Sequence, residues 1–166
     1  KNSKVMNALI NAARNGKKVT VIMELQARFD EESNIYWSKK LEQVGANVLF
    51  GIKGLKVHCK LVLINREEDK KIQKIAVIST GNFHERNAEV YTDVSLFTSD
   101  NRITCEVEKV FQFIDNTYLS FNYKHLLVSP MYMRKRLMQL IDNEAKNARK
   151  GKDAYIILKI NNLVDN

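Results

Sequence analysis

The sequence predicts an α/β fold in which a mixed β-sheet is flanked by helices. Short apolar, β-branched segments alternate with longer segments whose apolar residues recur at helical spacing. The chain has 166 residues, 45% of them hydrophobic, and a single proline. This length and composition suit one globular domain, or one domain with part of a second, and they exclude a disordered or low-complexity chain.

The first half of the chain alternates helices with strands. A first helix is predicted where apolar residues recur at spacings of three and four, at Val5, Leu9, Ile10 and Ala13, and Gly16 ends it. Residues 19–25, which are β-branched and apolar in character, indicate a buried strand. A second helix, capped by Asp30 or Ser33, should end at Gly45. A short strand over 46–50 and a turn over 51–54 follow.

The next elements are predicted to include an antiparallel pair of strands, which makes the sheet mixed. Residues 57–64 and 74–79 are the two strands, and the charged residues 65–71 are the loop between them. Residues 90–97 alternate and indicate a further strand. A helix capped by Asp100 should then bury one apolar face, made of Ile103, Val107, Val110, Phe111 and Ile114.

The remainder is expected to belong to another domain. Residues 121–129 lack periodicity and indicate a connection, a basic helix is predicted over 133–150, and a strand over 154–160. Because that strand has nothing after it to complete a unit, we expect a first domain over 1–125 and a truncated second domain over 126–166.

The net charge of +8 favours an anionic partner, such as nucleic acid, an acidic membrane or a phosphate-rich molecule. The densest basic runs, 134–136 and 146–152, lie on a helical pattern where a solvated face is the default interpretation. No apolar run is long enough to cross a bilayer, and no signal peptide is recognisable. The two cysteines, Cys59 and Cys105, form no CxxC pair, so reduced thiols are expected.

His58 and Lys60 are the first candidate catalytic pair. On the predicted strand 57–64 they would project from the same face, two residues apart. An imidazole beside an ammonium suits a phosphoryl group, because the histidine can attack phosphorus while the lysine offsets charge on the oxygens. A histidine that is merely exposed on an edge strand explains the spacing equally well.

Two further clusters follow predicted strands. Gly81 and Asn82, in STGNF at 79–83, can offer backbone N–H groups and an amide to an oxyanion. Arg28, in ELQARFDEE at 24–32, can clamp phosphate with its guanidinium fork. Tyr91 could stack on a base and Asp93 could orient a histidine, although ordinary strand packing is the simpler explanation of Tyr91.

Together these motifs resemble the polyphosphate kinases that extend polyphosphate from ATP. The matching segments are ELQARFDEE at 24–32, GLKVHCKL at 54–61, STGNFHER at 79–86, YTDVSLFT at 91–98, LVSP at 127–130 and LKINNLVDN at 158–166. The resemblance implies a phospholipase-D-like first catalytic domain and the start of a second such domain. It also implies that the first strand of the first domain lies upstream of Lys1.

The resemblance assigns roles residue by residue. His58 aligns with the histidine that becomes phosphorylated, and Tyr91 with a tyrosine that contacts the nucleotide. Arg28 aligns with an arginine of the magnesium–phosphate site, where a guanidinium can hold phosphate oxygens but cannot ligate Mg²⁺. The family therefore implies Mg²⁺ with ATP as substrate, and Lys60, Gly81, Asn82 and Asp93 as supporting residues.

One position departs from the phospholipase-D pattern. The pattern consists of HxK, four further residues and an aspartate, and this chain has Asn65 at the position of the aspartate. Asp93 is the candidate that would supply the missing carboxylate. Only one HxK half-site is present, so the chain alone is expected to be inactive. The implied partners are ATP or ADP, polyphosphate, the other domains of the enzyme and further copies of it, and nucleic acid is not expected. The implied location is the cytoplasm, or the periphery of a membrane.

Two alternatives remain open from the sequence. One is a non-catalytic module that binds phosphate or nucleic acid, and the other is a phosphodiesterase half-site that also forms a phosphohistidine. A nucleotide pocket separates a kinase from a general polyanion binder.

Overall fold

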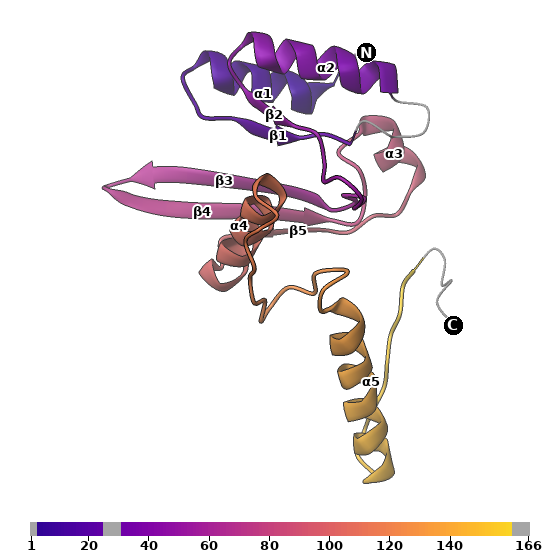
Figure 1. The fold of residues 1–166 in the computed structure, drawn as a ribbon. Helices are drawn as coiled ribbons and strands as arrows, with labels where there is room; N and C mark the ends of the chain where they lie inside the picture. The colour runs from indigo at the N-terminus through magenta and orange to yellow at the C-terminus, as the bar shows by residue number, and fades with distance from the viewer. Residues whose placement is uncertain (1–2, 25–30, 161–166) are drawn as a thin grey trace. The chain divides into compact units, whose positions relative to one another are not determined.

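The computed structural model describes residues 3–24 and 31–160 of the chain. The chain divides into two compact units, Lys1–Asn122 and Tyr123–Asn166 (Figure 1). Within the described residues, no helix is long and apolar enough to cross a membrane.

The N-terminal part of the first unit is a small parallel sheet covered by two helices. Strands β1 (Thr20–Ile22) and β2 (Asn47–Leu49) pair in parallel, and α1 (Lys4–Arg14) and α2 (Glu31–Gln43) pack on them (Figure 1). Their shared core contains Ile10, Met23, Trp37, Leu41 and Ala46, of which Leu41 is fully buried. Burial of these apolar side chains holds the short strands against the helices.

The other part of this unit is a three-stranded antiparallel sheet. Strands β3 (Lys60–Glu68), β4 (Lys71–Ser79) and β5 (Ser95–Thr98) pair in the order β3-β4-β5, and the short helix α3 (Glu85–Val90) lies between β4 and β5 in sequence. Helix α4 (Asn101–Asp115) packs on β3 and β4 (Figure 1). The Lys74 ammonium donates to the Glu108 carboxylate at 2.6 Å across this contact. That hydrogen bond raises the pKa of Lys74.

The second unit contains one helix, α5 (Met133–Arg149), among its described residues. Residues 123–127 and 152–160 are irregular, and no residue of α5 is buried. The apolar side chains of this helix, including Leu137 and Ile141, therefore remain largely exposed.

Several predictions of the sequence are confirmed. The fold is α/β with mixed strand directions and flanking helices, and residues of the two predicted antiparallel strands do pair. Gly16 and Gly45 follow α1 and α2 with φ of 75° and 81°, which glycine adopts without steric cost. The Asp100 carboxylate accepts from the Arg102 N–H at 2.9 Å and caps α4 as expected.

The predicted bounds of the first antiparallel strand are wrong. Strand β3 begins at Lys60, so His58 precedes the strand, and it continues through the charged residues that were expected to form a loop. Opposite charges pair at its end, where Glu68 faces Lys71. The connection is only Asp69 and Lys70, both with positive φ, as a two-residue hairpin turn requires.

Four other predictions also differ from the structure. The strand expected over 90–97 is shorter, because α3 occupies its start and β5 begins at Ser95. Residues 154–160 form no strand, because the described part of their unit offers no partner strand for the ladder. Among the described residues, the strands form two sheets rather than one. Ser33 lies inside α2 rather than at its cap, and the alternative cap, Asp30, lies outside the described residues.

The hairpin turn gives a stability prediction. Lys70 has φ of 61°, a left-handed conformation that costs an L-residue roughly 1–2 kcal/mol. Lys70→Gly should therefore raise the free energy of unfolding by about 1 kcal/mol, measured by chemical denaturation. Lys71→Gly removes the same charge from the adjacent strand residue and should lower stability by roughly 0.5–1 kcal/mol. Equal effects of the two variants would contradict this turn geometry.

Candidate active site

Three sequence motifs meet at one end of the three-stranded sheet. Strand β3 begins there at Lys60, β4 ends there at Ser79, and β5 begins there at Ser95. Lys60 pairs with Ser79, and Ser79 pairs with Ser95, so the three residues lie side by side on the same face of the sheet. The antiparallel pairing therefore collects the segments around His58, Gly81 and Asp93 at this end.

The Lys60 ammonium lies against His58. Its Nζ donates to the backbone carbonyl of His58 at 2.7 Å, and it is 3.1 Å from Nδ1 and 3.2 Å from Nε2 of the imidazole. His58 is exposed, whereas Lys60 is half-buried. The predicted pair thus comes together, but through a lysine that reaches back from the strand to the segment before it.

The charges around His58 disfavour its protonation. The Lys60 ammonium lowers the pKa of His58 most, and partial burial and Lys56 lower the pKa of His58 further. The ordinary histidine value is about 6.5, so the imidazole is mainly neutral at pH 7. A neutral imidazole has one ring nitrogen without a proton, and the lone pair of that nitrogen can attack. The neutral form is therefore the one that acts as a nucleophile.

The loop after β4 is fixed to the loop before β5 by hydrogen bonds. The Thr80 N–H donates to the Val94 carbonyl at 3.0 Å, and the Thr80 hydroxyl accepts from the Val94 N–H at 3.1 Å. The same hydroxyl donates to the Asp93 carboxylate at 2.9 Å. At the base of these loops the Ser95 hydroxyl donates to the Ser79 hydroxyl at 2.9 Å.

Gly81 leaves the space that the Asp93 carboxylate occupies. A Cβ built on Gly81 would collide with the carboxyl group of Asp93, so any other residue would force one of the two to move. Asp93 also acts on Lys60, because its negative charge opposes the effect of burial, which lowers the pKa of Lys60. Asn65 lies five residues after Lys60 in β3 and pairs with Lys74. Because side chains alternate along a strand, Asn65 lies on the opposite face of the sheet from Lys60.

Two other predicted site residues, Asn82 and Tyr91, lie between β4 and β5 in the sequence. Asn82 is exposed, and its backbone carbonyl accepts from the His84 N–H at 2.8 Å. Tyr91 follows α3 rather than lying in a strand, and it is 58% exposed. Arg28 lies outside the described residues, so its contact with phosphate stays a prediction.

Sequence reasoning gave no role to the hydroxyl groups at the strand ends. Ser79, Thr80 and Ser95 tie the loops together, and Lys56 adds a second positive charge near His58. The signal was present as Ser-Thr before Gly81 and Ser95 after Asp93. These hydroxyl groups could be assigned to one network only once the pairing of β4 with β5 was known, and the sequence alone does not reveal that pairing.

The described residues contain no group of three or more His, Cys, Asp or Glu side chains that could hold a metal ion. Asp93 is the carboxylate linked to the His58–Lys60 pair, and one carboxylate does not form a magnesium cage.

Two family models match the chain. "Polyphosphate kinase C-terminal domain 1" matches residues 1–120, and "Polyphosphate kinase C-terminal domain 2" matches residues 126–166. The chain belongs to the polyphosphate kinase family. The fold of this family, α/β with flanking helices, agrees with the class that the sequence predicts.

Relatives in the polyphosphate kinase family are similar over nearly the whole chain. Polyphosphate kinase from Vibrio vulnificus (strain YJ016) is 53% identical over 165 residues, and that from Escherichia coli (strain K12) is 51% identical. Both alignments cover 99% of this chain and 24% of the relative. The crystal structure of polyphosphate kinase from Porphyromonas gingivalis superposes with a TM-score of 0.77 at 37% identity, over 91% of this chain and 25% of that one.

The contact between Gly81 and Asp93 predicts a strongly coupled pair of substitutions. Gly81→Ala should lower the free energy of unfolding by roughly 1–3 kcal/mol, because its methyl group overlaps the Asp93 carboxylate. In the Asp93→Ala background the same substitution should cost much less, since the carboxylate is gone. A double-mutant cycle by chemical denaturation measures this difference. Additive costs would contradict the contact.

Proposed function

We propose that this chain is the part of a polyphosphate kinase that carries the phosphorylated histidine, and that the whole enzyme transfers the terminal phosphate of ATP to polyphosphate. The observation that carries the proposal is the neutral His58 imidazole beside the Lys60 ammonium at a sheet end where two more loops meet. Family membership supports a kinase over a phosphodiesterase half-site or a non-catalytic binding module.

His58 is the nucleophile in this proposal. A ring nitrogen attacks the γ-phosphorus of ATP, an N–P bond forms, and the P–O bond to the leaving ADP breaks. An acceptor oxygen at the end of a polyphosphate chain then attacks the phosphohistidine, and the imidazole is released. The lowered pKa of His58 supports this role, because the ring needs no base to remove a proton before it attacks.

Lys60 and the loop after β4 stabilise the transferring group. The Lys60 ammonium lies within hydrogen-bond distance of the imidazole, so it is placed to offset negative charge on the equatorial oxygens. Asn82 offers donors from the adjacent loop, whereas the Gly81 N–H donates to the Ser79 hydroxyl at 3.2 Å. The negative charge of Asp93 favours the charged form of Lys60. These groups act most strongly on the transition state, where charge spreads over the phosphoryl oxygens.

Arg28 and Tyr91 complete the substrate site by carry-over from the family. Arg28 would hold phosphate oxygens next to the magnesium ion that accompanies ATP, since a guanidinium is a donor and not a metal ligand. The exposed ring of Tyr91 is available to contact the nucleotide. Mg²⁺ would enter with ATP, held mainly by the phosphates.

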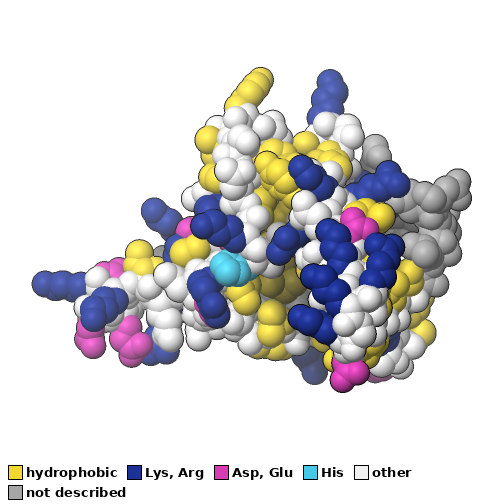
Figure 2. Space-filling view, turned by 90° about the horizontal axis from the view of Figure 1, so that it is seen from below, with side chains coloured by type: hydrophobic (Ala, Val, Ile, Leu, Met, Phe, Trp, Pro, Cys, Tyr) yellow, Lys and Arg dark blue, Asp and Glu magenta, His cyan; other side chains and the backbone are white. Residues whose placement is uncertain are grey.

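The chain spans about a quarter of the length of its relatives, 24% for each of the two above. We therefore propose that the remainder of the enzyme supplies the rest of the active site. The partners would be ATP, polyphosphate, the remaining domains with a second half-site, and further copies of the enzyme. The two units would belong to two phospholipase-D-like catalytic domains. The positive charge suits a polyanionic product in the cytoplasm or at a membrane surface. Lys and Arg side chains are prominent on the face shown in Figure 2.

The proposal predicts a labelled histidine. In the full-length enzyme, γ-³²P-ATP should give acid-labile, base-stable label on His58, and His58→Ala should reduce the label to background. His84→Ala is the matched control, because His84 is also exposed in the same unit and should leave the label unchanged. Undiminished label in His58→Ala, or loss in His84→Ala alone, would refute the assignment.

A further inference from the structure

Thr80 is the residue at which the pairing of β4 with β5 ends. The last regular pair joins Ser79 to Ser95, and Thr80 follows directly after it. The Thr80 N–H still donates to the Val94 carbonyl at 3.0 Å, as in one further antiparallel pair. The return bond differs, because the Val94 N–H donates to the Thr80 hydroxyl at 3.1 Å. The side chain of Thr80 thus takes the place that a backbone carbonyl would have in a regular ladder.

This exchange determines where the proton of the Thr80 hydroxyl goes. A backbone N–H can only donate, so the hydroxyl is the acceptor in its bond with Val94. Its own proton remains for a second partner, and the hydroxyl donates to Asp93 Oδ1 at 2.9 Å. An ionised carboxylate is an acceptor only, so the two groups match. The hydrogen bond from Thr80 to Asp93 therefore has a direction that the backbone of Val94 determines.

The second carboxylate oxygen of Asp93 is confined by Gly81. Oδ2 of Asp93 is the atom nearest to the position that a Cβ of Gly81 would occupy. The Gly81 N–H donates to the Ser79 hydroxyl at 3.2 Å, which fixes the chain at this point. One oxygen of Asp93 is thus held by Thr80 and the other lies over Gly81. The loop after β4 therefore orients a carboxylate that belongs to the segment before β5.

Asp93 acts on the catalytic pair through its charge. Partial burial lowers the pKa of Lys60 most, whereas the negative charges of Cys59 and Asp93 raise it and the charge of Lys56 lowers it. The Lys60 Nζ in turn lies 3.1 Å from Nδ1 of His58. A carboxylate that turned away from this end of the sheet would act less on Lys60, because the Coulomb interaction weakens with distance.

We propose that Thr80 is a positioning residue for phosphoryl transfer. Its hydroxyl holds the Asp93 carboxylate at the end of the sheet where the Lys60 ammonium meets His58. The inference rests on the proposed function, because it assigns Thr80 to the reaction that His58 would carry out. Thr80 acts through Asp93 and Lys60 and needs no contact with the transferring phosphate. Both side-chain hydrogen bonds of Thr80 use its hydroxyl group, so a serine should serve in its place.

Kinetics of the full-length enzyme with Thr80→Val and Thr80→Ser test the role of the hydroxyl. Valine keeps the shape of threonine and removes both hydrogen bonds, whereas serine keeps both. We expect Thr80→Val to lower kcat for polyphosphate synthesis about tenfold to a hundredfold, because a misplaced catalytic group costs rate on this order. The KM for ATP should change less than about threefold, since Lys60 acts mainly on the transition state. Thr80→Ser should stay within about twofold of the parent enzyme.

The pH profile of kcat separates positioning from a general loss of structure. If the Asp93 carboxylate moves away, the pKa of Lys60 falls, because the charge that raises it acts more weakly. The ammonium is then lost at a lower pH, so the alkaline fall of kcat should begin at a lower pH in Thr80→Val than in the parent enzyme. Asp93→Asn should show the same shift, and in that background Thr80→Val should add nothing further.

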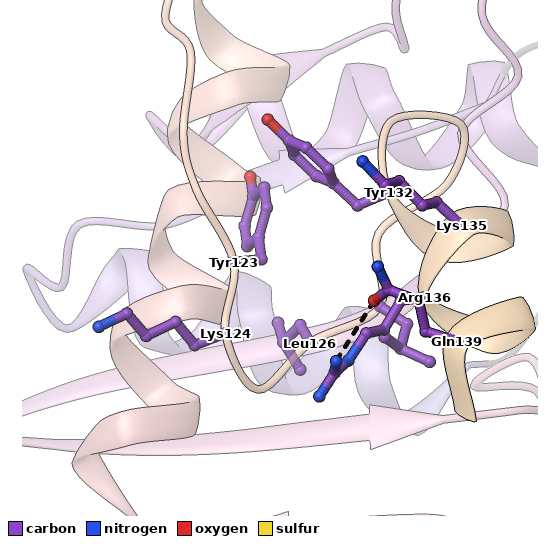
Figure 3. A pocket seen from close by; sticks show the side chains of 8 residues that line it. Tyr123, Lys124, Leu126, Tyr132, Lys135, Arg136 and Gln139 are labelled. Carbon is purple, nitrogen blue, oxygen red and sulfur yellow. Dashed lines mark hydrogen bonds between the residues drawn. The ribbon is translucent and has the colours of Figure 1, made fainter. Parts of the chain in front are cut away.

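Two variants control for the loss of a side-chain hydrogen bond as such. The Thr98 hydroxyl accepts from the Asp100 N–H at 3.0 Å at the other end of β5, and Thr98→Val removes this bond. In the second unit, the Arg136 Nη1 donates to the Gln139 Oε1 at 3.4 Å beside a cavity of about 210 Å³ (Figure 3), and Gln139→Ala removes this bond. Neither variant should change kcat or the alkaline limb of its pH profile, because neither bond takes part in the contacts of Thr80.

Equal losses of kcat in Thr80→Val and Thr80→Ser would overturn the inference, since the hydroxyl would not be the cause. An unshifted alkaline limb in Thr80→Val, or the same loss of kcat from Thr80→Val in the Asp93→Asn background, would also overturn it, because Thr80 would not act through Asp93. Full activity of the His58→Ala enzyme would instead refute the proposed function. Activity that needs His58 but is unaffected by Thr80→Val would refute the positioning role alone, so the two failures are distinguishable.

Discussion

The contact between the Lys60 ammonium and His58 places the two groups together and disfavours protonation of the imidazole. Lys60 is the first residue of β3, and its backbone is held by pairing with Ser79. From this anchored position its side chain donates to the His58 carbonyl at 2.7 Å and lies 3.1 Å from Nδ1. The irregular segment that contains His58 is thereby attached to the first residue of β3.

The state of Lys60 depends in turn on residues from two other segments. Burial lowers the pKa of Lys60, whereas the negative charge of Asp93 acts in the opposite direction. Asp93 occupies its place because Thr80 donates to it and because Gly81 has no side chain to displace it. Asp93 therefore contacts Gly81 and Thr80 and acts on Lys60 through its charge, and Lys60 contacts His58, so these interactions join three strand ends that are distant in sequence. This dependence explains how motifs at 54–61, 79–86 and 91–98 can act as one site.

Local signals in the sequence predicted the helices better than the strands. Gly16, Gly45 and Asp100 end or cap helices through their own conformational and hydrogen-bonding properties, so the sequence reveals them directly. The charged residues 65–68 looked like a loop, yet they continue β3 because each faces a residue of β4. Such pairing is a property of two strands together, which the composition of one segment does not contain.

The candidate site was predictable in its residues but not in its geometry. The spacing of His58 and Lys60 indicated a pair on one strand face, and the structure joins them although His58 precedes the strand. Asp93 could be named as the substitute for the carboxylate missing at Asn65, but only the pairing of β4 with β5 shows that it lies at the same end as Lys60. The network of Ser79, Thr80 and Ser95 needed the same information.

The central claim is that Lys60 keeps His58 neutral and so ready to attack phosphorus. An NMR titration of the His58 ring in the chain and in its Lys60→Met variant, which keeps the stem and removes the charge, tests this most directly. The account predicts a His58 pKa below the ordinary value of about 6.5, which rises toward it in Lys60→Met because the largest cause of the shift is gone. The neutral fraction should then be lost at a higher pH in the variant. Lys56→Met should raise the His58 pKa less, since Lys56 is the smallest of the three causes. An unchanged or lower His58 pKa in Lys60→Met would contradict the account.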